Sequence, residues 1–166
     1  MINQMDPNQI IKNLKTQGFI LKKSTDFEGG IERLTQDLSE LFSKYFSPQY
    51  VNLNFEIPAE YRAFLECAGG SFSLDNYYHL FNMNSLLSVT NFFIEEWEPN
   101  DSNAIWIHIG GYSDKRGYLM CCDKSKAEFG KISEYWDDHP WMDGERIFLE
   151  RHETDWNSIA EYSMSE

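Results

Sequence analysis

Apolar residues recur at three- and four-residue spacing in two stretches of the first part of the chain, which predicts two helices there. The first helix covers residues 7–17 and the second covers residues 31–45. Their apolar positions are Ile10, Ile11 and Leu14 in the first and Leu34, Leu38, Leu41, Phe42 and Tyr45 in the second. Between them, residues 19–22 form either a brief strand or an extended linker, and Ser47-Pro48 ends the second helix.

The stretch around which the chain is organised is residues 57–70, IPAEYRAFLECAGG. Pro58 has the fixed φ that suits the first position of a helix, and Gly69-Gly70 supplies the left-handed residue that commonly ends one. The apolar positions between them form one stripe, made of Tyr61, Phe64, Leu65 and Ala68. These features predict a short helix with one buried face, and a strand that begins soon after Gly70.

Alternating, β-branched and aromatic positions predict strands in the rest of the chain. These strands cover residues 77–81, 105–109, 118–123, 131–136 and 146–150. The second and third are separated by GGYSDKRG, which indicates a hairpin with a long loop. Two further helices are expected, one that Ser85 begins and that runs through Phe92, and one that Thr154 or Asp155 begins and that runs to Tyr162.

This order of elements predicts a single α+β domain in which helices pack against a mostly antiparallel sheet. We assign the domain to residues 1–166, with a helical part over residues 1–48 and an acidic α+β part over residues 49–166. An apolar fraction of 42% in 166 residues suits one hydrophobic core. No apolar run is long enough for a membrane span, and the N-terminus lacks the regions of a signal peptide. We therefore expect a soluble cytoplasmic protein.

The formal charge of −13 is unevenly distributed along the chain. Residues 1–48 hold six acidic and six basic residues, so the excess belongs to residues 49–166, with 21 acidic against 8 basic residues. No Lys or Arg occurs between Arg62 and Lys115. Such a field repels nucleic acid and attracts basic partners. The alternative is that the acidity serves solubility alone.

The pattern of residues 57–70, in which Ile-Pro precedes a Tyr, an apolar-rich turn and Gly-Gly, resembles the signature helix of the SUKH superfamily. Further counterparts are Gly110-Gly111, Gly117-Tyr118 with Leu119 to Asp123, Gly130-Lys131-Ile132, and the helix from Trp156 to Tyr162. Where the family often has Asp after the second Gly, this chain has Tyr118, and the family's terminal Ser-Phe pair is Asp155-Trp156 or Ser158-Ile159 here. The superfamily includes Smi/Knr-like fungal cell-wall-synthesis regulators and bacterial immunity proteins that neutralise polymorphic toxins, often nucleases. The resemblance covers about residues 30–162 and implies a binding function.

No residue pattern indicates catalysis. The chain lacks a nucleophile elbow, and GGYSDKRG lacks the order of a phosphate-binding loop. Cys67, Cys121 and Cys122 have no CxxC spacing, so we expect reduced thiols. His79 and His108 lie on predicted strands and are expected to be ordinary sheet residues.

One segment is a metal candidate, namely Asp137-Asp138-His139, together with Asp143 or His152. Carboxylate and imidazole groups bind divalent cations, but no HExxH or Cys/His spacing fixes a geometry here. The alternative is a solvated turn that leads into Pro140. We therefore expect no metal, no cofactor and no catalytic residue, and a protein that is not an enzyme.

Two segments combine tryptophan with carboxylates, as binding surfaces do when aromatic side chains fill a dry centre and charges surround it. One is an acidic loop over residues 95–103 that contains Trp97, and the other is WDDHPWMDGE over residues 136–145. The expected partner-binding residues are Glu95, Glu96, Glu98, Asp101, Trp136, Asp137, Asp138, Trp141, Asp143 and Glu145. The alternative is that each tryptophan folds back onto the core, which we favour for Trp97, Trp106 and Trp156 and leave open for the other two.

The resemblance and the charge together predict an immunity protein that occludes the active surface of a cognate toxin. The acidity of residues 49–166 adds that this toxin is a basic nuclease domain. The alternative is a regulatory or scaffold protein that resembles the fungal members. Neither nucleic acid nor membrane is expected as a partner, and the oligomeric state is open.

Overall fold

The structure is a computed structural model and describes residues 4–23, 29–74, 78–80, 82–96, 98–99, 104–112, 116–143 and 146–164. Along these residues helices and strands follow in the order α1 (Pro7–Thr16), β1 (Ile20–Lys23), α2 (Gly30–Phe42), α3 (Pro48–Asn54), α4 (Ala59–Ala68), β2 (Gly70–Leu74), β3 (Tyr78–Leu80), α5 (Met83–Glu96), β4 (Glu98–Pro99), β5 (Trp106–Tyr112), β6 (Arg116–Cys121), β7 (Ile132–Asp143), β8 (Arg146–Trp156) and α6 (Ile159–Met164).

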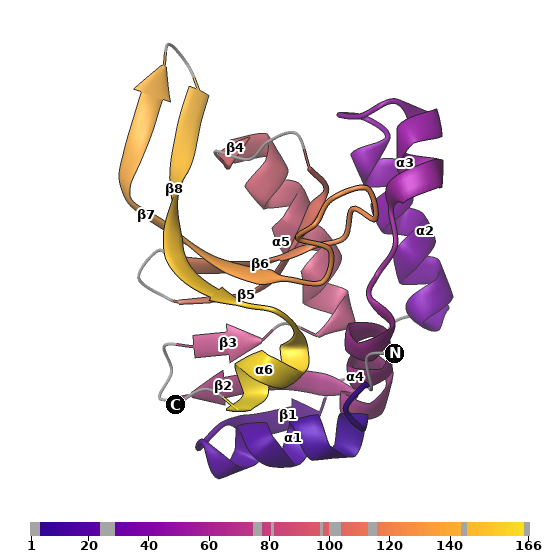
Figure 1. Ribbon diagram of the computed structural model, residues 1–166, viewed down its shortest axis with the longest axis vertical. Coiled ribbons are helices and arrows are strands. Elements are labelled where there is room, and N and C mark those ends of the chain that lie inside the picture. The colour runs from indigo at the N-terminus through magenta and orange to yellow at the C-terminus, as the bar shows by residue number, and fades with distance from the viewer. Residues whose placement is uncertain are drawn as a thin grey trace.

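The described strands form one eight-stranded sheet in the order β1-β2-β3-β5-β6-β7-β8-β4. Neighbouring strands are antiparallel except for β4, which pairs with β8 in parallel. The predicted α+β fold with a mostly antiparallel sheet is therefore confirmed. Figure 1 shows the long β7–β8 hairpin extending away from the helices, while α1 and β1 lie at the opposite end of the molecule.

The central helix α4 confirms the predicted buried stripe. Its four stripe residues are 1–4% exposed, namely Tyr61, Phe64, Leu65 and Ala68. Gly69 ends the helix with φ +60°, and the Lys23 ammonium donates to the Ala68 carbonyl oxygen at 2.9 Å, where the helix dipole favours a cation. Pro58 lies one position earlier than predicted, at the N-cap, because the first helical residue is Ala59.

The strand that follows α4 explains the second glycine of the pair. Gly70 is the first residue of β2 and pairs with Lys23 of β1. A Cβ at Gly70 would collide with the main-chain carbonyl oxygen of Lys22, so a side chain cannot be accommodated there without moving β1. Gly69 is therefore needed for its left-handed backbone conformation, whereas Gly70 is needed because there is no room for a Cβ.

The hairpin β5–β6 lies at the centre of the core. Ile105, Ile107 and Ile109 have no exposed surface, and Leu119 and Met120 are at most 1% exposed. Helix α5 packs against β5, where the Thr90 hydroxyl oxygen accepts a hydrogen bond from the His108 amide at 3.0 Å. The predicted loop over residues 110–117 is shorter than expected, since Gly110, Gly111 and Gly117 belong to the strands.

Helix α3 was not predicted. The Ser47-Pro48 pair, expected to end the second helix, instead begins α3, because Ser47 accepts a hydrogen bond from the Tyr50 amide and Pro48 occupies the first turn. Helix α2 has already ended at Phe42. Tyr45, predicted to lie on its apolar face, is 49% exposed as a result.

The boundaries of α5 and α6 also differ from the prediction. Asn82, and not Ser85, caps α5, since its side-chain oxygen accepts from the Ser85 amide at 2.8 Å. The last helix is capped by the Ser158 hydroxyl, which accepts from the Glu161 amide. The predicted caps Thr154 and Asp155 lie in β8 instead, because this strand runs on to Trp156.

Both acidic segments contain more helix and strand than predicted. Residues 95–96 are the last turn of α5 and residues 98–99 form β4, where a loop was predicted. Strand β7 continues through residues 137–140, where a turn was the expected alternative. The β7–β8 register shifts between residues 136 and 141, which accommodates Pro140 because proline has no amide to donate to the ladder.

Candidate functional site

The two acidic segments that the sequence singled out come together around β8. On one side of this strand, Trp141 of β7 pairs with Phe148. On the other side, Glu98 of β4 pairs with the same Phe148. Backbone pairing thus places Glu98 and Trp141, which are about forty positions apart in the sequence, on the two strands that flank β8, at one end of the sheet (Figure 1).

We call this region the acidic edge and define it as the end of α5 (residues 95–96) together with β4, β7 and β8. It contains eight of the ten expected partner-binding residues, namely Glu95, Glu96, Glu98, Trp136, Asp137, Asp138, Trp141 and Asp143. The other two, Asp101 and Glu145, lie outside the described residues.

The acidic edge holds more charge than the sequence analysis assigned to it. Ten carboxylate residues against two arginines give it a net charge of −8, out of −13 for the whole chain. Sequence reasoning missed the carboxylates in the half of the hairpin farther from its tip, which are Glu134, Glu150, Glu153 and Asp155. Beyond Glu150, Thr154 and Trp156 have β propensity and lie two residues apart, and this was the signal that could have extended the last strand.

The strand register also shows which residue lies opposite each arginine of the hairpin. Arg146 is opposite Asp143 across β7 and β8, and Arg151 is opposite Tyr135. Cross-strand neighbours of opposite charge support strand pairing. The first of these two pairs joins opposite charges, so Arg146 fits a role in holding the hairpin together, and the net charge of the acidic edge stays at −8.

The tryptophans divide into two groups. Trp106 is 4% exposed, and Trp156 packs edge-on against Tyr118 and Tyr162, with ring centroids 5.8 and 4.9 Å away. The prediction that these two tryptophans belong to the core is confirmed. Trp97 lies outside the described residues. Whether Trp136 and Trp141 contact a partner stays a prediction.

Burial keeps one histidine and two cysteines in their neutral forms. Burial lowers the pKa of His108 to about 4, so the imidazole is neutral at pH 7. Burial raises the pKa of Cys121 to about 11 and that of Cys122 well above its usual value, so both are protonated thiols. All three cysteines are unpaired by disulfides, as predicted.

Neither a metal centre nor a membrane segment is found in the part of the chain that the structure describes. No group of three or more His, Cys, Asp or Glu side chains there could hold a metal ion. No helix among the described residues has the length and apolar character needed to cross a bilayer. The metal candidate Asp137-Asp138-His139 lies on β7, within the acidic edge.

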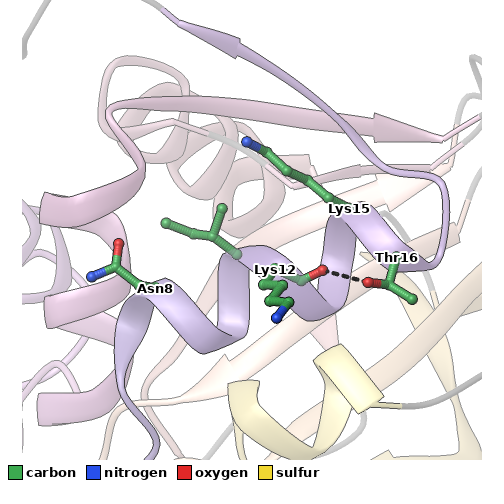
Figure 2. A pocket seen from close by; sticks show the side chains of 5 residues that line it. Asn8, Lys12, Lys15 and Thr16 are labelled. Atoms are coloured by element: carbon green, nitrogen blue, oxygen red, sulfur yellow. Dashed lines mark hydrogen bonds between the residues drawn. The ribbon is translucent and has the colours of Figure 1, made fainter.

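A surface groove of about 500 Å³ lies at the other end of the molecule, on α1. Figure 2 shows the side chains that line it, which are Asn8, Ile11, Lys12, Lys15 and Thr16. The groove carries positive charge, and no residue of the acidic edge lines it among those described. The two charged regions are therefore separate surfaces.

Comparison with known families gives one match. The model of the SMI1 / KNR4 family (SUKH-1) matches residues 52–162. This range begins within α3 and ends within α6, so it contains the central helix, the acidic edge and every described strand except β1. No match was found among curated proteins or among solved structures.

Proposed function

This chain belongs to the SMI1/KNR4 family (SUKH-1), and from that premise we propose that it is a non-enzymatic immunity protein that binds a cognate bacterial toxin. The toxin is a basic nuclease domain, and the acidic edge covers the surface with which that nuclease holds its substrate. The bound nuclease can then no longer reach nucleic acid.

One observation carries this proposal, namely the pairing of β4, β8 and β7 that gathers a charge of −8 at one end of the sheet. Nucleases bind the phosphate backbone through lysine and arginine residues. A surface that presents many carboxylates is complementary to such a cation-rich face, and it accelerates the encounter of the two proteins at low ionic strength. The buried thiols Cys121 and Cys122 are protonated rather than nucleophilic thiolates, which fits a role in binding.

The test is to mix the protein with the toxin domain encoded by the neighbouring gene and to measure affinity and residual nuclease activity. We expect inhibition of the nuclease at a one-to-one ratio. We also expect affinity to fall steeply between about 0.1 M and about 1 M salt, where the Debye length shrinks from about 10 Å to about 3 Å. Affinity that does not depend on salt would contradict the electrostatic part of the proposal.

Charge-neutralising variants locate the interface. We expect the triple variant Asp137→Asn/Asp138→Asn/Asp143→Asn to lower the association rate with the nuclease by at least tenfold, because complementary charges at an interface act chiefly on the encounter of the two proteins. The matched control removes three carboxylates from α2 and α4, at Glu32, Glu40 and Glu66, which are exposed and lie outside the acidic edge. Equal losses in both variants would show that net charge alone matters and that the acidic edge is not the interface.

Two further outcomes would redirect the proposal. If no toxin gene adjoins this gene, a regulatory or scaffold protein becomes the better hypothesis. If the purified protein turns over a substrate and loses that turnover in Asp138→Ala or His139→Ala, the protein is an enzyme and the proposal is wrong.

A further inference from the structure

A second charged surface, of opposite sign, is formed by α1 and β1. Residues 7–23 contain four lysines and no acidic residue, although the chain as a whole has a net charge of −13. Lys12, Lys15, Lys22 and Lys23 are all exposed. We call α1 and β1 the basic edge. Figure 1 places it at the end of the molecule opposite the tip of the β7–β8 hairpin.

Strand β1 is an end strand of the sheet. Within the described residues it pairs with β2 on one side only, from Ile20 opposite Ser73 to Lys23 opposite Gly70. The outer side of an end strand presents main-chain donors and acceptors that can pair with a further strand. Ile20, at the start of β1, is 68% exposed and offers an apolar contact beside them.

The groove on α1 adjoins this strand along the chain. Residues 17–19 alone connect α1 to β1, and the turn is closed by bonds from the Gly18 amide to Lys15 and from the Phe19 amide to Leu14. The five groove residues occupy one face of α1, opposite the buried Ile10 and Leu14. Lys12 and Lys15 on this face therefore add positive charge to the helix that leads directly into β1 (Figure 2).

The charges select what can pair with β1. Lysines on an end strand repel a basic strand from another molecule and disfavour a neutral one, which would take their charges out of water. The same charges attract an acidic strand. A second copy of this chain is a poor occupant. The opposite end strand, β4, has two residues, one of which is Pro99 with no amide hydrogen to donate.

We propose that β1 accepts an extended acidic segment of a partner protein as an additional strand of the sheet. Main-chain hydrogen bonds to β1 supply the affinity, and Lys12, Lys15 and Lys22 attract the carboxylates of the segment. Lys23 is engaged with the end of α4 through its bond to the Ala68 carbonyl oxygen. This surface is distinct from the acidic edge, so the protein has two interfaces that accept partners of opposite charge.

The test uses a blocked synthetic peptide, acetyl-Val-Glu-Val-Glu-Val-Glu-amide, and the amide resonances of the full-length protein. We expect the peptide to shift the amide signals of residues 20–23 and to bind more weakly as salt is raised. Two control peptides separate charge from strand pairing. One replaces Glu by Lys, and the other keeps the composition but has D-valine, which prevents a regular strand.

Variants then locate the site. We expect Lys12→Glu/Lys15→Glu/Lys22→Glu to weaken peptide binding about tenfold, equivalent to about 1.4 kcal/mol. The control Lys44→Glu, at an exposed lysine between α2 and α3, should leave peptide binding unchanged. Unchanged nuclease binding in the triple lysine variant would support separate interfaces, and loss of nuclease binding would overturn them.

Three results would overturn the proposal. The first is no shift at residues 20–23 with the acidic peptide at about 1 mM, a concentration that detects binding with a Kd as weak as about 1 mM. The second is equal binding of the D-valine peptide, which would mean charge attraction without strand pairing. The third is equal binding of the lysine peptide. None of these results bears on the proposed nuclease interface.

Discussion

The two glycines after the central helix are required for different reasons, and substituting each by alanine measures the two energetic costs separately. At Gly69 an added Cβ would meet only the Lys23 ammonium, at 3.8 Å, so the cost is that of a left-handed residue at φ +60°. For a residue with a Cβ this cost is about 1–2 kcal/mol. At Gly70 the Cβ would collide with the Lys22 carbonyl oxygen, which belongs to the main chain and cannot rotate away.

We therefore expect Gly70→Ala to be the more damaging change. Strand β1 must move away from β2, and overpacking of this kind costs about 3 kcal/mol. For a chain of 166 residues, this corresponds to a fall in Tm of roughly 6–12 °C, against roughly 2–8 °C for Gly69→Ala. The assay is urea unfolding of both variants and the parent, with the m-value checked for a change in the unfolded state.

Hydrogen exchange adds a local measurement to the same experiment. In Gly70→Ala the amides of β1 and β2 should lose protection, whereas in Gly69→Ala the loss should be confined to the end of α4. The reasoning is refuted if Gly70→Ala unfolds at the same urea concentration as Gly69→Ala, or at a higher one. The close approach of β1 to Gly70 would then contribute no more to stability than the left-handed conformation of Gly69 does.

Three further predictions concern polar side chains, two that join distant segments by hydrogen bonds and one whose pKa is shifted by burial. The Glu60 carboxylate accepts from the Met5 amide at 2.8 Å and from the Ala160 amide at 3.3 Å, so Glu60→Gln should cost about 1–2 kcal/mol in thermal unfolding, with the exposed Glu66→Gln as control. A result within the error of the control would contradict this role. The Asp123 carboxylate has no exposed surface and accepts hydrogen bonds from the Tyr50 hydroxyl at 2.5 Å and from the Ser125 hydroxyl at 2.6 Å. Asp123→Asn puts an amide nitrogen in place of one acceptor, so we expect urea unfolding to show a loss of stability of about 2–3 kcal/mol. An Asn variant as stable as the parent would show that one oxygen suffices. The pKa of His108 is lowered from 6.5 to about 4, so the unfolded chain binds a proton that the folded protein does not, and this contribution to stability is lost as the pH falls from 6.5 to 4. At pH 5 it should amount to a loss of about 2 kcal/mol relative to pH 7, measured by urea unfolding together with an NMR titration of the imidazole, and an imidazole that titrates near 6.5 would exclude it.

Much of the fold follows from short stretches of sequence. The buried stripe of α4, the antiparallel pair β5–β6 and the strand after Gly70 were all predicted, because apolar periodicity and glycine conformation act within a few residues. The errors lie at element ends. A Ser-Pro pair can end one helix or begin another by its local chemistry, and in the structure Ser47-Pro48 begins α3, which packs against α2.

The composition of the candidate site was predicted from the sequence, but its secondary structure was not. The acidic and aromatic composition of residues 95–98 and 136–143 was visible in the sequence, and both segments were named as partner-binding. Their regular structure was not, since Pro99 and Pro140 are unusual in strands and favoured loop predictions. The basic edge was missed altogether, because β1 is short and its lysines gain significance only from its place at the end of the sheet.

By itself, the sequence determined where the acidic residues occur, which face of the central helix is buried and which family pattern the chain follows. The tertiary structure alone decided that β4 and β7 flank β8, and that Gly70 must lack a side chain because another strand passes against it. The physical reason is the range of the interactions. Helix periodicity and φ preferences are set by neighbours in the chain, whereas strand pairing joins residues about fifty positions apart and depends on how the whole chain packs.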